Sequence, residues 1–304
     1  MRKFELTILG CGAAAPTPYF LTTSQLVNIH GQLILIDCGE GTQLTLRQTK
    51  AKFQKINIIL ISHMHADHTM GLPGLIATMS LLGRRTSLNI WGPKELEEFV
   101  RRTWYLTGTH VDFEVKFHVN SSIGPNVVVD SESFMITSFP TKHRVPTCGF
   151  VIEEKEGVLS LKGHARKDYN LSHLDIQILK RGEDIVKKGE VIPNMFCMEK
   201  PPKCRKYAFA ADTAFSPKVV EAVKGCNLLY HEATFETKDL DIAKKTLHST
   251  SSDAARVAKD AGVNQLLIGH FSNRYRDLSQ LFLEATEVFT NTSIAKENKT
   301  YLIE

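Results

Sequence analysis

Three histidines and one aspartate lie within six residues of the chain, in the segment SHMHADH that follows the apolar run INIILI. They are His63, His65, Asp67 and His68. Neutral imidazoles and carboxylates are the usual protein ligands of zinc, and a loop that leaves a strand can fold them around one point. The segment therefore predicts a metal site at the end of a strand.

Further ligand candidates stand in equivalent places, each directly after a run typical of a strand. In open α/β structures, functional sites gather in the loops at the carboxyl ends of strands. A lone histidine is more often structural, but the same choice repeated at four strand ends favours a shared site. These candidates are His143, Asp212, His231 and His270.

The elements that would position these residues alternate along the chain. β-Branched and aromatic content or strict alternation predicts strands, and segments opened by Ser, Thr or Pro predict helices, which together indicate an α/β protein. The predicted strands cover residues 3–10, 25–39, 56–62, 87–92, 114–119, 134–141, 149–154, 206–213, 227–234, 265–271 and 299–304. The predicted helices cover residues 71–83, 93–106, 216–225, 250–262 and 277–289.

Composition is that of a compact soluble protein, with 304 residues, 42% hydrophobic and 23% charged. The net charge of +4 permits a polyanionic partner without requiring one. The sequence shows no signal peptide and no apolar run near the roughly 18 residues of a membrane span. Six scattered cysteines are typical of reduced thiols, which predicts a cytoplasmic protein: Cys11, Cys38, Cys148, Cys197, Cys204 and Cys226.

One segment, residues 153–205, interrupts the alternation of elements. Its pattern of strands and helices is weak, and an insertion of this length suggests a functional excursion or disorder. Basic residues are scattered through it: Lys162, Arg166, Lys167, Lys180, Arg181, Lys187 and Lys188.

The segment SHMHADH fits the H-x-H-x-D-H signature of the metallo-β-lactamase superfamily. Four further segments, GPKELEEFVRRT, HEATF, HSTSSDAA and GHFSNRY, resemble ribonuclease Z in that order, and the likeness spans most of the chain. The resemblance implies one metallo-β-lactamase-like domain over residues 1–304, a four-layer αββα sandwich, with 153–205 as an inserted flexible arm that grips tRNA. It also implies a zinc-dependent endoribonuclease of the short, homodimeric form, which cleaves the 3′ trailer from precursor tRNA and leaves a 3′-hydroxyl and a 5′-phosphate.

The same resemblance implies two metal ions per chain. His63, His65 and His143 would hold the first ion, Asp67, His68 and His270 the second, and Asp212 would bridge them. Zinc is expected, although manganese or iron would also suit these ligands. Two ions about 4 Å apart can hold a water, lower its pKa toward ~7 and clamp a phosphoryl group, with Asp67 orienting that nucleophile.

Outside the metal ligands, the resemblance implies His248 as the general acid for the leaving ribose oxygen, steered by Glu232. Ser249, Thr250 and Arg274 are candidate phosphate contacts, although the run STSSD could equally cap a helix. His231 is expected to have a structural role or to support a metal ligand.

Two departures from the family pattern affect recognition of RNA. The arm lacks the usual Gly-Pro turn and has NLSHLDIQILKRGED in its place, and TPYFLTTSQ replaces a basic loop associated with sensing the tRNA end. Rejection of a mature CCA end is therefore open. The alternative function is a small-molecule phosphodiesterase or arylsulfatase of the same superfamily; a non-catalytic RNA-binding relative is disfavoured because every expected ligand is present.

Overall fold

The fold is described from a computed structural model, in which residues 3–121 and 123–304 are placed well enough to describe. The chain divides into two compact units. The larger unit comprises Met135–Glu153, Arg205–Glu304 and the described residues before Ser131, and the smaller comprises Ser131–Phe134 and Glu154–Cys204.

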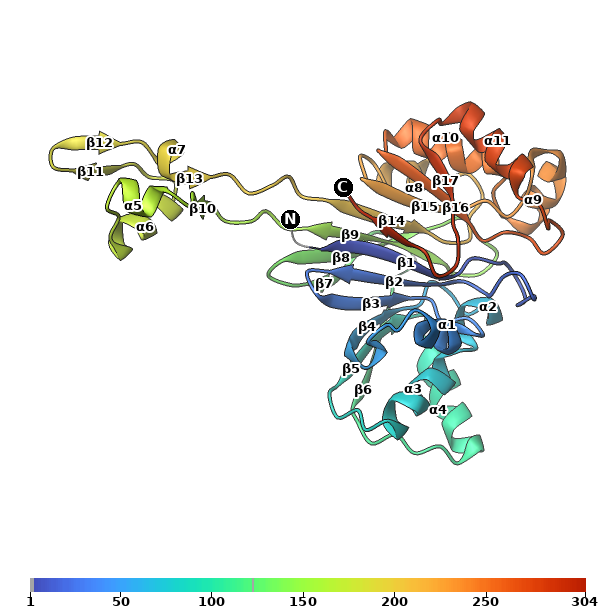
Figure 1. The fold of residues 1–304 in the computed structure, drawn as a ribbon. Helices are drawn as coiled ribbons and strands as arrows, with labels where there is room; N and C mark the ends of the chain where they lie inside the picture. Colours follow the sequence, from blue (N-terminus) through green and yellow to red (C-terminus); the bar gives the residue numbers. More distant parts are fainter. Residues whose placement is uncertain (1–2, 122) are drawn as a thin grey trace. The chain divides into compact units, whose positions relative to one another are not determined.

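Two seven-stranded sheets form the centre of the larger unit (Figure 1). The first sheet has the order β18-β1-β2-β3-β4-β5-β6, and the second has the order β17-β16-β15-β14-β9-β8-β7. The first contains β1 Phe4–Gly10, β2 Ser24–Ile29, β3 Gln32–Ile36, β4 Ile56–Leu60, β5 Leu88–Gly92, β6 Val115–Val119 and β18 Thr300–Leu302. The second contains β7 Asn126–Asp130, β8 Phe134–Pro140, β9 Cys148–Glu154, β14 Lys206–Ala210, β15 Leu228–Glu232, β16 Gln265–Gly269 and β17 Thr292–Ile294.

Parallel pairing in both sheets brings the carboxyl ends of several strands to a common edge. Strands β3 to β6 are parallel neighbours in the first sheet, and β14 to β17 are parallel neighbours in the second. Strand β15 is buried at every position because both faces of its sheet are covered.

Helices cover the outer face of each sheet (Figure 1). On the first sheet lie α1 Thr42–Gln48, α3 Leu72–Leu81 and α4 Leu96–Thr107, and on the second lie α8 Pro217–Ala222, α10 Ser251–Ala261 and α11 Ser279–Val288. Two further helices, α2 Ala66–Thr69 and α9 Leu240–Thr246, stand at the common edge of the strands. The order of layers is helix, sheet, sheet, helix, which confirms the predicted αββα sandwich.

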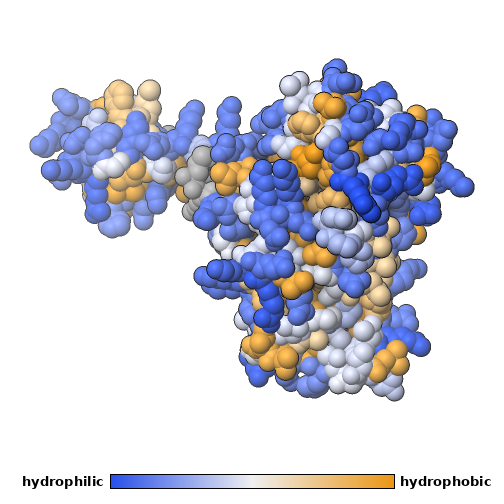
Figure 2. All heavy atoms as spheres, turned by 45° about the vertical axis from the view of Figure 1, so that its right-hand side comes forward, coloured by the Kyte–Doolittle hydropathy of each residue, from blue (hydrophilic) through white to orange (hydrophobic). Residues whose placement is uncertain are grey.

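The two sheets contact each other through buried side chains. The hydroxyl of Tyr207 on β14 donates to Gln25 on β2, and both residues are buried. On the outer side of the first sheet, Leu35, Ile59 and Ile90 share an apolar core with the helices. The face of the molecule seen in Figure 2 carries many hydrophilic side chains, with apolar ones among them.

The smaller unit is ordered and has its own core. It contains α5 Ala165–Asp168, α6 His173–Lys180, α7 Asn194–Cys197 and the strand pairs β10 Ser160–Leu161 with β13 Met198–Glu199 and β11 Ile185–Lys187 with β12 Glu190–Ile192. Helix α6 begins with a capping box between Ser172 and Asp175. Such short elements leave little periodicity in a sequence, which explains why the pattern was weak here. The core residues are Ala165, Leu171, Leu179, Ile185, Cys197 and Met198.

Most strands and helices predicted from the sequence are present, with ends shifted by a few residues. The segment 25–39, predicted as one strand run, is the hairpin β2–β3, whose turn places His30 and Gly31 at positive φ. Helices α1 and α9 and strands β7 and β17 were not predicted, because they are short and lack clear periodicity.

Candidate metal centre and catalytic site

All seven predicted ligands meet at the common edge of the strands. After β4, the chain turns into α2, so that His63, Asp67 and His68 face inward and are buried. The remaining ligands follow other strands: His143 comes after β8, Asp212 after β14 and His270 after β16. Parallel strands from two sheets therefore bring together residues up to 207 positions apart, between His63 and His270.

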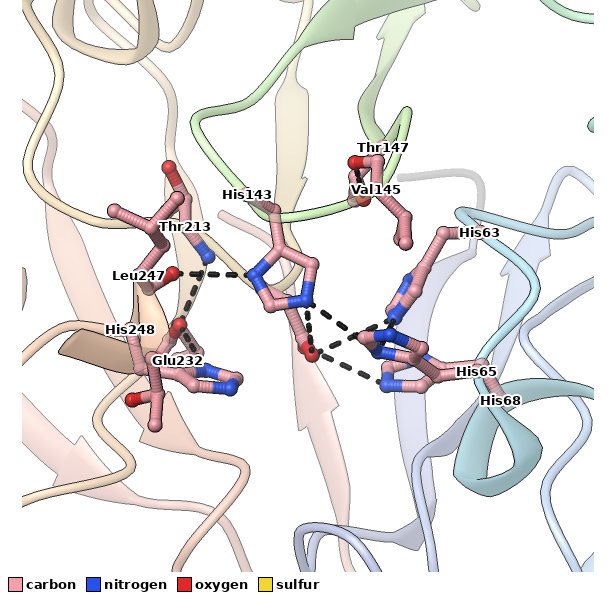
Figure 3. A network of polar contacts seen from close by, with 12 residues as sticks. His63, His65, His68, His143, Val145, Thr147, Thr213, Glu232, Leu247 and His248 are labelled. Atoms are coloured by element: carbon pink, nitrogen blue, oxygen red, sulfur yellow. Dashed lines mark hydrogen bonds and ion pairs between the residues drawn. The ribbon is translucent and has the colours of Figure 1, made fainter.

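The first ligand group consists of His63, His65, His143 and Asp212 (Figure 3). The Nε2 atom of His63 lies 2.9 Å from Nδ1 of His65 and 3.5 Å from Oδ2 of Asp212. The Nε2 atom of His143 lies 3.4 Å from the same nitrogen of His65 and 3.7 Å from the same oxygen of Asp212. Three nitrogens and one oxygen thus surround a single point.

The second ligand group consists of Asp67, His68 and His270, with the other oxygen of Asp212. Asp212 Oδ1 lies 3.4 Å from Nε2 of His68 and 3.2 Å from Nε2 of His270. Asp67 Oδ2 lies 3.6 Å and 3.4 Å from the same two nitrogens. The carboxylate of Asp212 therefore presents one oxygen to each group.

Both groups fit divalent metal ions. Bonds of about 2.0–2.1 Å in a tetrahedral zinc site separate ligand atoms by roughly 3.3–3.4 Å, close to the spacings found here. His68 Nε2, Asp212 Oδ1 and His270 Nε2 are fully buried without a hydrogen-bond partner among the described residues. A buried polar atom without a partner is costly, and a metal ion would satisfy all three.

Burial keeps several imidazoles in the form that binds metal. The pKa values of His63, His65 and His143 are lowered, first by desolvation, although the carboxylate of Asp212 opposes the shift. These histidines are therefore neutral at pH 7, as a metal ligand must be.

The buried carboxylate of Asp37 positions two ligands. His68 donates from Nδ1 to Asp37 Oδ2 at 2.6 Å, which leaves Nε2 facing the second group. The hydroxyl of Ser62 donates to the same carboxylate at 2.9 Å and accepts from Nδ1 of His63 at 3.0 Å. Sequence reasoning missed Asp37, although it too follows an apolar strand, in the run LILID.

A backbone carbonyl positions His143. Its Nδ1 donates to the oxygen of Leu247 at 3.1 Å, so that Nε2 points toward the first group (Figure 3). Leu247 ends helix α9 with φ at 57°, a left-handed conformation that turns the chain toward the site. A backbone carbonyl that accepts such a hydrogen bond cannot be recognised in the sequence, because every residue has one.

Glu232 is the second buried carboxylate of the site. It accepts hydrogen bonds from the backbone N–H groups of Thr213, Thr234 and Ser249, from the hydroxyl of Thr234 and, at 2.8 Å, from Nδ1 of His248. Burial alone would lower the pKa of His248, but the neighbouring carboxylate raises it to about 9. His248 is therefore protonated at pH 7 and can donate a proton.

The His248 ring lies beside both ligand groups. Its centroid is 5.0 Å from that of His143 and 5.5 Å from that of His270. It is also close enough to Asp212 and His270 to form a third group of potential ligands with them. Geometry alone therefore permits two roles for His248, proton donor and metal ligand.

The predicted phosphate contacts are engaged within the protein. Ser249 is buried and donates to the carbonyl of Thr213, and Thr250 caps α10 through a capping box with Asp253. The capping alternative thus holds for Thr250, while substrate contact by either residue stays a prediction. Arg274 lies over the ring of Phe235 and is partly exposed, 3.7 Å from a carboxylate oxygen of Asp239. His231 is fully buried and belongs to none of the potential ligand groups formed by the described residues.

The stacked sheets, the outer helices and a paired His/Asp cluster at the strand ends define a protein of the metallo-β-lactamase fold. Comparison of structures agrees: human tRNase Z, short form, matches over 99% of both chains with a TM-score of 0.72 and 26% identity. The metallo-beta-lactamase fold protein YhfI from Bacillus subtilis matches over 99% of both chains, with a TM-score of 0.70 and 20% identity.

Sequence comparison gives the particular family. Residues 4–161 match the sequence family described as Anti-Pycsar protein Apyc1, so the chain falls within that family over its first half. Over its whole length it is 45% identical to Ribonuclease Z of Bacteroides fragilis (strain YCH46), with 98% of each chain covered. The chain belongs to the ribonuclease Z family.

Proposed function

We propose that this protein is a zinc-dependent endoribonuclease that removes the 3′ trailer from precursor tRNA. It would leave a 3′-hydroxyl on the tRNA and a 5′-phosphate on the trailer. Relatives named Ribonuclease Z and the similarity to human tRNase Z support the substrate. The observation that carries the proposal is the presence, in one site, of both ligand groups and the hydrogen-bonded pair of Glu232 and His248.

The two ligand groups would accommodate two ions. His63, His65 and His143 would hold one ion, Asp67, His68 and His270 the other, and Asp212 both. When bound, two divalent ions neutralise charge on a phosphodiester and lower the pKa of water toward ~7. Zinc suits these nitrogen and oxygen ligands, although manganese or iron would also be accepted.

His248 and Asp67 would transfer the protons of the reaction. Water attacks phosphorus as the bond to the ribose O3′ breaks, and a proton must reach that oxygen because an alkoxide is a poor leaving group. His248 is protonated at pH 7 and is held at Nδ1 by Glu232, so its Nε2 is the donor. Asp67 would accept the proton of the attacking water, with Oδ2 held by the backbone N–H of Ala14 at 2.8 Å.

The smaller unit would serve as the tRNA-binding arm. Its exposed basic residues include Arg166, Lys167, Lys180, Arg181 and Lys188. Side chains of this kind neutralise phosphates without reading bases, which suits recognition of a folded RNA by its shape. Lys187, in contrast, is held by Asp175 at 3.0 Å and contributes to the unit's own structure.

We also infer a homodimer formed through the helical face of the first sheet. Large apolar side chains are exposed there on three neighbouring helices: Leu44 on α1, Leu81 and Leu82 at the end of α3, and Tyr105 and Leu106 on α4. Exposed apolar side chains in such numbers are typical of an interface. Sedimentation of the wild type against Leu81→Glu tests this, because a dimer through this face should dissociate in the variant.

A cytoplasmic location completes the proposal. Cys11, Cys38, Cys148, Cys197 and Cys226 are buried thiols outside any disulfide, as expected in a reducing compartment. Within residues 3–121 and 123–304, no helix has the length and apolar character needed to cross a membrane.

The proposal is tested by incubating the purified protein with a precursor tRNA that carries a 3′ trailer. We expect one cut, a tRNA that ends in a 3′-hydroxyl and a trailer that begins with a 5′-phosphate, and loss of the cut after chelation. An intact precursor, together with rapid hydrolysis of a nitrophenyl phosphodiester or sulfate, would instead identify the small-molecule hydrolase.

A further inference from the structure

A cavity of about 350 Å³ lies beside the metal centre, at the carboxyl ends of β4, β5 and β6. Ser62, which precedes the ligand His63, forms part of its wall, and so do Thr147 and Cys148, which end the loop that carries His143. The backbone N–H of Cys148 donates to the carbonyl of Ser62 at 3.2 Å, so this wall is fixed to the metal site. Nothing in the proposed reaction uses the cavity.

The lining combines apolar walls with polar side chains, a mixture that a small-molecule site can use for orientation. Pro93, Val119 and Pro146 supply saturated surfaces, and Lys94 lies at the rim with its side chain 80% exposed. The volume is at the small end of the ~300–1,000 Å³ range of ligand sites, enough for one base and part of its ribose.

Asn120 is the polar group that distinguishes this cavity. Its Nδ2 donates to the sulfur of Cys148 at 3.7 Å, and its Oδ1 is buried with no hydrogen-bond partner among the residues described. A buried carbonyl oxygen without a donor is unfavourable, which points to a ligand that brings an N–H group. The amide oxygen suits a base that offers an amino group.

The cavity and His248 flank the metal centre on different sides. The imidazole rings contact one another in the order His248, His143, His63, and no ring contact between His248 and His63 occurs among the described residues. Ser62, in the cavity wall, adjoins His63, whereas His248 adjoins the leaving ribose oxygen of the tRNA in the proposed reaction. The nucleotide on the other side of the scissile phosphate is the first one of the trailer.

We infer that this cavity binds the first nucleotide of the trailer, with its base between Pro93, Val119 and Pro146 and an amino group of the base donating to Asn120 Oδ1. The inference rests on the proposed function, and it gives the enzyme a preference for adenine or cytosine over uracil at this position. Among the described residues, the saturated walls offer no aromatic ring on which a base could stack. Selectivity then comes from the shape of the cavity and one hydrogen bond, so the preference among bases is modest.

The test compares two substitutions of exposed valines. Val119→Trp fills the cavity, while Val127→Trp makes the same change on β7, away from the cavity; the valines are 66% and 52% exposed. Both variants and the wild type are assayed on precursor tRNAs with A, C or U as first trailer nucleotide, on precursors that differ in the last tRNA nucleotide, and on bis(p-nitrophenyl) phosphate. Asn120→Ala is assayed on the same set.

We expect Val119→Trp to lower kcat/KM on precursor tRNA at least tenfold and to match Val127→Trp on the nitrophenyl ester. Asn120→Ala should lose about three- to tenfold on A and C trailers and little on U, the effect of one hydrogen bond. Three outcomes would overturn this inference and leave the proposed function standing. They are equal RNA cleavage by the two tryptophan variants, an equal loss by Val119→Trp on RNA and on the nitrophenyl ester, and a nucleotide preference set by the last tRNA nucleotide. A wild type that hydrolyses the ester but leaves every precursor intact would overturn the proposed function as well.

Discussion

The hydroxyl oxygen of Thr234 lies 3.0 Å from Nδ1 of His270. The same hydroxyl donates to Glu232 at 2.6 Å, so it must accept from the imidazole N–H, and Nε2 of His270 is left for the second ligand group. Across the site, Ser62 connects Asp37 to His63 in the same way. Each buried carboxylate thus holds one histidine directly and a second through a hydroxyl, which fixes the orientation of four imidazoles.

Thr234→Val should weaken metal binding without changing the fold of the protein. Valine has nearly the same shape but cannot accept from His270, and loss of such a supporting hydrogen bond typically costs 10–100-fold in metal affinity or activity. Thr234→Ser restores the hydroxyl and should recover most of the loss. Zinc titration of the three proteins measures the effect, and wild-type affinity in Thr234→Val would show that the hydrogen bond does not position the ligand.

Asp212→Ala should deplete both metal positions, because each oxygen of this carboxylate faces a different ligand group. Asp67→Ala is the matched control, since Asp67 contributes to the second group alone. Metal analysis of the purified proteins should give about two ions per chain for the wild type and about one for Asp67→Ala. Asp212→Ala should retain well under one ion per chain. A full complement in Asp212→Ala would exclude the bridging role.

Strand-end positions in the sequence predicted an α/β protein and several candidate ligands, and the resemblance to ribonuclease Z supplied the αββα sandwich and the set of seven side chains that meet in the structure. The sequence could not reveal the partners that orient them. The carbonyl of Leu247 and the hydroxyls of Ser62 and Thr234 act through positions that only the folded chain defines. The secondary structure of the smaller unit could not be predicted for another reason. Its elements are short and its core residues few, so its sequence shows no hydrophobic periodicity.

The smaller unit should affect RNA binding but not hydrolysis itself. Replacing Lys167, Lys180 and Arg181 by alanine removes exposed charges, so KM for precursor tRNA should rise while hydrolysis of a nitrophenyl phosphodiester is kept. The slope of log affinity against log salt should flatten by about one for each phosphate that is no longer neutralised. The matched control replaces Lys218, Lys224 and Lys259, which are exposed on the larger unit. Equal damage by both triple variants would mean that total charge, rather than this unit, binds tRNA.

Helix α6 of the smaller unit should become less stable in acid than at neutral pH. Hydrogen bonds from the backbone and hydroxyl of Ser172, with Lys187 nearby, lower the pKa of Asp175 from 3.8 to about 2. A lowered pKa stabilises the folded form above the unfolded value, so this contribution is complete above about pH 4 and is lost as the pH falls toward 2. Amide exchange of α6 in the full chain should accelerate over that window in the wild type. In Asp175→Asn the exchange should be faster throughout and show no such step; identical profiles would exclude Asp175 as the cause.

His248→Ala separates the two roles that its position permits. If His248 protonates the leaving ribose oxygen, the variant should keep both metals and lose about 10²- to 10⁴-fold on precursor tRNA. A nitrophenyl phosphodiester expels a stable phenolate that needs little protonation, so the loss on that substrate should be far smaller. His65→Ala removes a ligand of the first group and should fail on both substrates.

Metal content decides between the outcomes. A His248→Ala protein that loses an ion together with activity on both substrates would identify His248 as a ligand, through its group with Asp212 and His270. A protein that keeps its ions but loses equally on both substrates would mean that His248 orients the phosphate or the attacking water. The hydrogen bond from Nδ1 of His248 to Glu232 and the raised pKa of His248 favour the proton donor, because a general acid must carry the proton that it transfers.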